Sequence, residues 1–178
     1  LIAGAVLTIV LQASSATMAI TMLLAASGLI DFKLAIAMVL GENIGTTITA
    51  NIAAAVANTS AKRAARAHTI FNLIGVIWVL CLLKPIIGLI CHIMVALGFY
   101  DPVEASSQLA AIANSGVAAD PEQIEMYKNS LLYGIAMLHT LFNVTNTAVL
   151  IWFVPLIEKA VVWLVKEPKG ETEVFRLK

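Results

Sequence analysis

Charged residues are scarce in this sequence. Only 12% of the 178 residues are Asp, Glu, Lys or Arg, and no charge precedes Asp31, whereas 60% of the residues are hydrophobic. A soluble domain carries about a quarter charged residues, so this composition excludes an ordinary soluble protein. The net charge is zero and there is no long basic run, so we expect no nucleic acid as a partner. The sequence predicts an all-α integral membrane protein in contact with the lipid bilayer.

Cysteines and catalytic groupings are also sparse. The two cysteines, Cys81 and Cys91, lie in apolar runs without metal-ligand spacing, so we expect small buried hydrophobic side chains. No catalytic dyad or triad is readable, so we expect neither an enzyme nor a cofactor. The first residues include no Met and no basic segment followed by a cleavage site, which excludes a signal peptide there. We therefore expect the interior of a longer chain.

Polar residues are instead concentrated in the middle of one apolar segment, at positions 34–56. The stretch Gly41–Asn51 holds two glycines, Glu42, two asparagines and three threonines. Burying such groups in hydrocarbon costs several kcal/mol each unless protein, water or a bound solute faces them. Helical spacing puts Asn43 and Thr46 on one face. We therefore predict a binding site here, on a helix that is broken at its glycines.

A simpler interpretation of the same stretch stays open. The threonines, Thr47 among them, could hydrogen-bond to their own helix, and the glycines could let a neighbouring helix come close. This interpretation explains the glycines and threonines well. It does not explain Glu42, whose carboxylate would lie near the middle of a membrane span.

A second polar cluster interrupts the first apolar segment, Leu1–Leu29. It spans Gln12–Thr17 and includes Ser14 and Ser15. The apolar arms on either side are short for a crossing, which needs ~20 residues. We therefore predict a re-entrant hairpin with the polar residues at its tip, where protein or water must cover them. A single crossing helix with Gln12 facing a neighbour is the alternative.

The charges in the connecting segments predict an orientation. Ser60–Arg66 carries three cations and no acid, so the positive-inside rule predicts that it is cytoplasmic. Asp101–Gln123 carries four acids and no cation, so we expect it outside, with a short surface helix. Residues 1–165 would form the transmembrane transport domain and end in an interfacial helix at Leu156–Val165. Residues 166–178 would be a cytoplasmic polar tail that leads into a soluble domain.

The later apolar segments show a helix break and a repeated motif. The run His68–Phe99 exceeds one perpendicular crossing and contains Pro85, so a helix should end or kink there. One five-residue motif occurs twice with four identities, at His68–Asn72 and His139–Asn143. Histidine in a span is a functional candidate, but these His and Asn side chains could equally clamp helices together. We expect His92 to be an interior residue.

The polar motifs resemble those of a known family. Gln12-x-Ser14-Ser15-Ala16-Thr17, followed by Gly41-x-Asn43-Ile44-Gly45-Thr46-Thr47, resembles the type II sodium/phosphate cotransporters. The resemblance covers Leu1–Asn72 well and Tyr133–Trp152 more loosely. It implies one half of an inverted-repeat transporter, the second repeat, in the plasma (inner) membrane of a bacterium, which the protein would cross several times. The first repeat would lie outside this sequence.

The resemblance also implies the residues that bind the solutes. It assigns phosphate to the hairpin tip, at Gln12, Ser14 and Ser15. It assigns sodium to side-chain oxygens, at Gln12, Asn43, Thr46 and Thr49. A role in coupling or in structure falls to Glu42, Thr47, His68, Asn72, His139 and Asn143. Hard sodium ions prefer oxygen ligands, and phosphate suits hydroxyls and helix N-termini. The implied function is symport of inorganic phosphate into the cell with sodium as a co-transported ligand.

Two positions depart from the family pattern and leave alternatives open. Ala13 stands where the family usually has a serine, and Glu42 where a small or neutral residue is more usual. The chain could therefore carry another anion, or couple transport to protons through Glu42. It could also be a non-transporting membrane scaffold whose polar cluster only joins helices. An intramembrane metalloenzyme or haem protein would use His68 and His139, although two histidines alone make a weak metal site.

Overall fold

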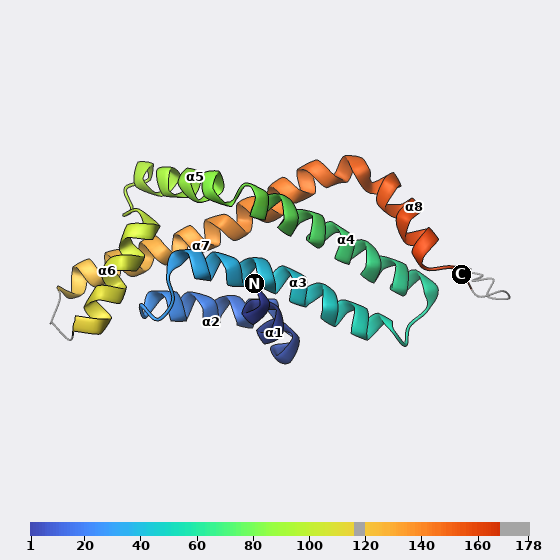
Figure 1. Cartoon of the computed structure of the whole chain (residues 1–178), viewed down its shortest axis with the longest axis horizontal. Coiled ribbons are helices and arrows are strands. Elements are labelled where there is room, and N and C mark those ends of the chain that lie inside the picture. Colours follow the sequence, from blue (N-terminus) through green and yellow to red (C-terminus); the bar gives the residue numbers. More distant parts are fainter. Residues whose placement is uncertain (116–119, 168–178) are drawn as a thin grey trace, which may run out of the picture.

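The computed structural model describes residues 1–115 and 120–167, and every regular element in them is a helix (Figure 1). The helices, in chain order, are α1 (Ile2–Leu11), α2 (Ser14–Ala26), α3 (Phe32–Ala54), α4 (Thr59–Cys81), α5 (Leu83–Ala96), α6 (Pro102–Ser115), α7 (Pro121–Leu150), the 3-10 helix η1 (Ile151–Phe153) and α8 (Val154–Leu164). The predicted all-helical class is confirmed for this part of the chain.

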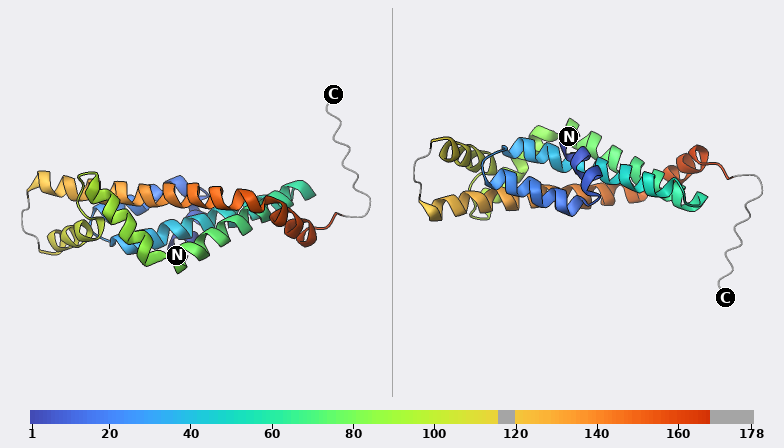
Figure 2. Two further views of the ribbon diagram at one scale, coloured as in Figure 1. Left: turned by 90° about the horizontal axis from the view of Figure 1, so that it is seen from above. Right: turned by 90° about the horizontal axis from the view of Figure 1, so that it is seen from below.

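The helices form an elongated bundle around α3. The helices α1, α2, α4, α6 and α7 all pack against it. Figure 2 shows α3, α4 and α7 running along the long axis, with α6 at one end and α8 at the other. The 30 residues of α7 span ~45 Å at 1.5 Å per residue, so this helix covers most of the length. Among the polar residues of α3, Glu42 and Thr47 are buried, whereas Lys33 near the start of the helix is exposed.

The apolar core occupies the first half of α3. Phe32, Ile36 and Leu40 are fully buried, and they belong to the same cluster as Leu131 and Ile135 of α7. Each fully buried aliphatic side chain contributes about 1.5–3 kcal/mol relative to its exposed state. The second half of α3, from Gly41 onward, is left for polar residues.

The outer surface is strongly apolar. Ile2, Val56, Trp152 and Trp163 are among many large hydrophobic side chains that lie exposed. Two described segments are long and apolar enough to cross a membrane, Thr59–Cys81 and Pro121–Leu164. So many exposed large hydrophobic side chains indicate a surface that lipid or further protein covers.

Local chemistry explains where the helices begin and end. Asp31 and Asn58 cap α3 and α4, since their side chains accept hydrogen bonds from the N–H groups of Leu34 and Ala61. The predicted break near Pro85 is confirmed. Proline lacks an N–H, and its ring clashes with the carbonyl four residues earlier, so α4 ends at Cys81 and α5 starts anew at Leu83.

The predicted break in the Gly41–Asn51 stretch is wrong. The helix α3 runs without interruption from Phe32 to Ala54. The glycines serve a close approach of α1 instead. A Cβ atom on Gly41 would collide with the carbonyl oxygen of Leu1, and one on Gly45 would lie 2.7 Å from that of Ala5. Glycine permits this contact between two helix backbones and does not open the helix.

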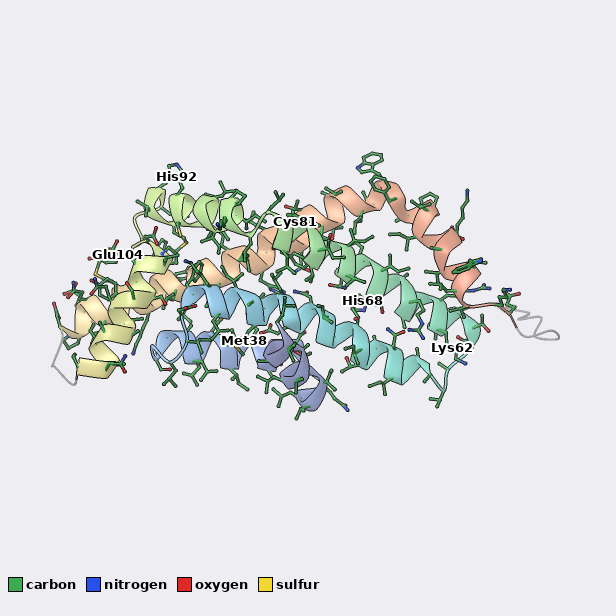
Figure 3. The ribbon with its side chains drawn as sticks, viewed as in Figure 1. Met38, Lys62, His68, Cys81, His92 and Glu104 are labelled. Atoms are coloured by element: carbon green, nitrogen blue, oxygen red, sulfur yellow. The ribbon has the colours of Figure 1, made fainter. Side chains whose placement is uncertain are left out.

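Several smaller predictions have mixed outcomes. The expected surface helix is present as α6, and the expected final helix as α8. Cys91 is buried as predicted, whereas Cys81 is exposed beside the break between α4 and α5. His92 is not an interior residue, because it points outward from α5 (Figure 3). Of the predicted tail, residues 168–178 lie outside the described residues.

Candidate functional site

The helices α1 and α2 form a hairpin whose turn is only two residues long. Gln12 adopts a left-handed backbone conformation, with φ 52° and ψ 24°, and Ala13 is extended. A left-handed non-glycine residue costs about 1–2 kcal/mol, so packing elsewhere must hold this turn in place. The turn exposes Gln12, Ser14 and Ser15 at the tip. The hairpin shape is therefore present, while its re-entry into a membrane stays a prediction.

The first turn of α2 has no side-chain cap. Ala13 occupies the N-cap position, where serine, threonine, aspartate or asparagine would normally accept a hydrogen bond from the first turn. The backbone N–H groups at the start of α2 therefore point out of the helix end, at the positive end of its dipole. The hydroxyls of Ser14 and Ser15 stand beside them. Such an arrangement of donors favours an anion.

The polar side chains of α3 donate hydrogen bonds to their own helix. The hydroxyl of Thr46 donates to the carbonyl of Glu42 at 2.8 Å, and that of Thr49 to the carbonyl of Thr46 at 2.9 Å. The amide nitrogen of Asn43 donates to the carbonyl of Val39 at 3.0 Å, and Thr47 is buried and donates to Ile44. These bonds within the helix are what the simpler interpretation of the stretch predicted. They use the side-chain hydrogens and leave the lone pairs of the hydroxyl and amide oxygens free, and a hard cation binds such lone pairs.

Glu42 is buried between α2 and α3. Its side chain is 3% exposed, and the hydroxyl of Thr21 donates to its Oε1 atom at 2.9 Å. Within residues 1–115 and 120–167, no Lys, Arg or His forms an ion pair with it. A buried carboxylate with one neutral donor needs a proton or a cation to balance its charge. Glu42 is therefore the most unusual polar group in the bundle.

Sequence reasoning missed two of the threonines that line this region, Thr8 and Thr21. Thr8 of α1 donates to Thr17 of α2 at 3.1 Å, and both are buried, as is Thr21. Thr17 and Thr21 lie one helical turn apart, a spacing that could have revealed a polar face on α2. Together with Glu42, these threonines form a buried polar line through the contact of α1, α2 and α3.

The α1 arm of the hairpin packs against the middle of α3, from Met38 to Gly45. Gly4 lies against the backbone of Met38, and Gly45 against the Cβ atom of Thr8. Figure 3 labels Met38 at this crossing of α1 with α3. Within the described residues, no hydrogen bond joins the tip residues Gln12, Ser14 and Ser15 with Asn43, Thr46 or Thr49. The structure thus brings the hairpin to α3 but does not join these two sets of side chains.

The two His–Asn motifs do not clamp α4 to α7. Asn72 donates to the carbonyl of His68 at 3.1 Å and Asn143 to that of His139 at 2.8 Å, so each amide stays on its own helix. No group of three His, Cys, Asp or Glu side chains in residues 1–115 and 120–167 could hold a metal ion. The metalloenzyme interpretation therefore gains no support from this region.

Asn146 joins these helices instead. This side chain is buried, donates to the carbonyl of Phe71 at 3.1 Å and accepts from the indole N–H of Trp78 at 3.2 Å. A Cβ atom on Gly75 would collide with the same amide, so α4 is shaped to receive it. It lies three residues beyond Asn143, outside the repeated motif, and no local pattern marks it.

Apolar helices that carry buried polar groups along their length are typical of membrane transport proteins. The chain belongs to the Na+/Pi-cotransporter family, whose sequence model matches residues 1–100. This match covers α1 to α5 and confirms the predicted family. The looser resemblance at positions 133–152 lies outside it.

Several curated proteins are similar to parts of the chain. YqeW of Bacillus subtilis, an uncharacterized protein, is 41% identical over 90 residues, which make up 51% of this chain and 29% of YqeW. The "Putative inorganic phosphate export protein YjbB" of Salmonella typhimurium is 34% identical over 86 residues, 48% of this chain and 16% of YjbB. The Escherichia coli protein of the same name is 32% identical over 91 residues, 51% of this chain and 16% of its own length.

The matches thus span less than a third of the length of these relatives. No solved structure matches the chain.

Proposed function

We propose that the chain is the second-repeat half of a carrier that moves inorganic phosphate together with sodium across the plasma membrane of a bacterium. Membership of the Na+/Pi-cotransporter family supports both solutes. The observation that carries the proposal is the hairpin tip. There the uncapped first turn of α2 and the exposed Ser14 and Ser15 hydroxyls offer several donors to one oxyanion.

Sodium is proposed to bind at the oxygens of α3, as a co-transported ligand. The hydroxyls of Thr46 and Thr49 each donate their hydrogen to a backbone carbonyl, so the lone pairs of both oxygens stay available for a cation. The amide oxygen of Asn43, whose nitrogen donates to Val39, adds a third acceptor. The Gln12 side chain, at the tip, would complete the set when the hairpin closes on α3. Oxygen ligands of this kind suit a hard monovalent cation.

The first repeat is the proposed partner of this half. The tip of the hairpin is exposed in the described chain, and irregular polar backbone at membrane depth must be covered by protein or line a water-filled cavity. A second, inverted copy of the same hairpin and helix would supply that cover. The transport domain would then comprise residues 1–165 together with this first repeat.

The direction of net transport follows from the gradients. A secondary carrier lowers the barrier in both directions, so the combined sodium and phosphate gradients set the direction of flux. The inward sodium gradient of a cell favours uptake of phosphate. The name of the YjbB relatives concerns export, so flux is best measured in both directions.

A direct test removes polar groups from the hairpin tip. We expect Gln12→Ala and Ser15→Ala in the full-length protein to cut sodium-driven phosphate flux into proteoliposomes by at least tenfold. Each change removes a group that contacts the solute, and tenfold corresponds to about 1.4 kcal/mol, within the range of one hydrogen bond to a charged group. Radioactive phosphate flux at several sodium concentrations gives the readout.

Ser27→Ala is the matched control for these variants. Ser27 is another serine of this hairpin region, and its hydroxyl donates only to backbone carbonyls of α2. Its loss should leave flux unchanged. Normal flux in both tip variants would show that the assignment of the phosphate site is wrong.

Coupling to protons is a second candidate, and the burial of Glu42 favours it. The structure gives this carboxylate a threonine donor and no basic partner among the described residues. A proton could neutralise it in one state of the carrier and leave in another. The same geometry also suits sodium, because Glu42, Thr46 and Thr49 lie on one face of α3 at intervals of four and three residues.

Glu42→Gln separates these two possibilities. If sodium neutralises Glu42, lowering the pH protonates the carboxylate, removes its negative charge and weakens the apparent sodium affinity of the wild type. Glu42→Gln should then bind sodium roughly tenfold more weakly at neutral pH, about 1.4 kcal/mol, and lose most of the pH dependence. If protons drive transport, the variant should instead lose flux driven by a pH gradient.

Sodium dependence of flux at two pH values, for wild type and Glu42→Gln, is the measurement. Glu104→Gln is the control, since Glu104 is exposed on α6 at one end of the bundle (Figure 3). Identical curves for wild type and Glu42→Gln would remove Glu42 from both coupling schemes.

A further inference from the structure

A small basic cavity lies at the end of α3, where this helix meets the start of α4. Its volume is about 150 Å³, and its lining residues are Asn51, Ala54, Ala55, Lys62, Arg66 and Val165. This is roughly ten times the space that one ordered water requires, ~15 Å³. Figure 3 labels Lys62 at this end of the bundle and Glu104 near the other. The cavity is therefore separate from the hairpin and large enough for a hydrated oxyanion.

The two cations of the cavity share one face of α4. Lys62 and Arg66 are four residues apart, a spacing that brings helical side chains together. The alanines of α3 opposite them are small and leave the space open. The nearby end of α3 carries a partial negative charge of about half an elementary charge, which the two full positive charges outweigh. The cavity thus has a net positive field.

Arg63 shapes the cavity without contributing a free charge. Its guanidinium donates to the carbonyl of Val165 at 3.1 Å and pairs with Glu167 at 2.9 Å. This is the one ion pair formed within residues 1–115 and 120–167, so neither Lys62 nor Arg66 pairs with a described carboxylate. Arg63 therefore holds Val165 in the wall of the cavity and pairs with Glu167, the acid two residues beyond Val165.

Asn51, which lines the cavity, connects the two helices that form it. Its amide group, which carries two hydrogens, donates to the hydroxyl of Thr69 and to the carbonyl of Thr47, each at 2.7 Å, and the carbonyl of Ala65 lies 3.3 Å from the same nitrogen. These bonds tie α3 to α4 directly behind Lys62 and Arg66. The two cations are consequently held on a rigid helix pair, at the end of the helix that carries the polar face from Asn43 to Thr49.

We propose that Lys62 and Arg66 form a second oxyanion site, which binds a phosphate group at the end of α3. The phosphate group has two possible sources, free inorganic phosphate on its way to or from the carrier, or the headgroup of an anionic lipid. The first source rests on the proposed function, whereas the site itself does not. At about 1 kcal/mol for each cation, neutralising both should weaken binding roughly thirtyfold, or about 2 kcal/mol.

Binding of radioactive inorganic phosphate to the purified full-length protein tests the free anion. Lys62→Gln/Arg66→Gln should lose one class of phosphate sites, and the charge-preserving swap Lys62→Arg/Arg66→Lys should retain it. Lys84→Gln/Lys128→Gln, which removes two exposed cations elsewhere, is the matched control. The tip variant Gln12→Ala/Ser15→Ala should keep this class of sites, so failure of the hairpin assignment and failure of this proposal give different results.

The lipid source is tested with vesicles. Full-length protein is reconstituted in phosphatidylcholine alone or mixed with phosphatidylglycerol, and retained phosphatidylglycerol is measured after purification. Loss of retained lipid in Lys62→Gln/Arg66→Gln, with unchanged phosphate binding, identifies the headgroup as the occupant. Loss of phosphate binding with unchanged lipid identifies the free anion. If the double variant keeps both as the wild type does, the proposal is overturned.

Discussion

At the scale of single residues, Asn146 joins two helices, a role that the sequence suggested for the His and Asn side chains of the repeated motif. It bridges α4 and α7 through the carbonyl of Phe71 and the indole of Trp78, whereas Asn143 only bonds within its own helix. Both residues are asparagines on α7, so the sequence alone gives no reason to assign them different roles. Burial distinguishes them, because only Asn146 lies in the contact between the helices.

Replacing each of these asparagines should reveal the difference. Asn146→Ala removes two hydrogen bonds between helices and leaves the half-buried indole N–H of Trp78 without its acceptor, at about 1–3 kcal/mol for such a group. We expect it to lower the free energy of unfolding by about 2–4 kcal/mol. Asn143→Ala should cost less than about 1 kcal/mol. Thermal unfolding of the full-length protein in detergent measures both, and equal losses would contradict the role of Asn146.

At the scale of the elements, the contact of α1 with α3 defines the hairpin. Gly4, Gly41 and Gly45 let the two backbones touch, and the buried Thr8 of α1 lies against Gly45 of α3. This arrangement explains why α3 needs no break. The glycines lie where the hairpin crosses, and the helix stays continuous beneath it.

A methyl group at position 41 should therefore displace the hairpin. Gly41→Ala would press its Cβ atom against the carbonyl of Leu1, which is backbone and cannot rotate away. We expect a loss of about 2–3 kcal/mol in stability, typical of overpacking. Gly88→Ala is the control, because nothing lies within 4 Å of its added Cβ atom. There alanine should stabilise α5 by about 0.5–1 kcal/mol. Thermal unfolding compares the two, and a harmless Gly41→Ala would disprove the close contact.

At the scale of the whole molecule, the basic end at Lys62 and the acidic end at Glu104 lie far apart (Figure 3). The positive-inside rule then predicts that the α3–α4 end is cytoplasmic and the α6 end external. Both ends belong to one elongated bundle, so the orientation of one determines that of the other.

Cysteine labelling in intact cells tests this orientation. In full-length protein with Cys81→Ala and Cys91→Ala, an impermeant thiol reagent should label Gln108→Cys and not Lys62→Cys. Gln108 is exposed on α6, and lysis of the cells should make position 62 reactive. The opposite pattern would invert the predicted topology.

The sequence by itself determined the helices, several of their ends, the two polar clusters and the family. These properties are local. Apolar runs long enough for a helix, caps such as Asp31 and a proline at position 85 act within a few residues of each other. The motifs around Gln12 and Asn43 identified the family for the same reason, since each is a short run of adjacent residues.

Only the tertiary structure decided which partner each buried polar group finds. Glu42 meets Thr21 across 21 positions, and Asn146 meets Phe71 across 75. The role of Gly41 was decided in the same way, because glycine permits either a helix break or a close contact. A single helix cannot distinguish these outcomes. They depend on which neighbouring helix packs against it, and that is a property of the bundle as a whole.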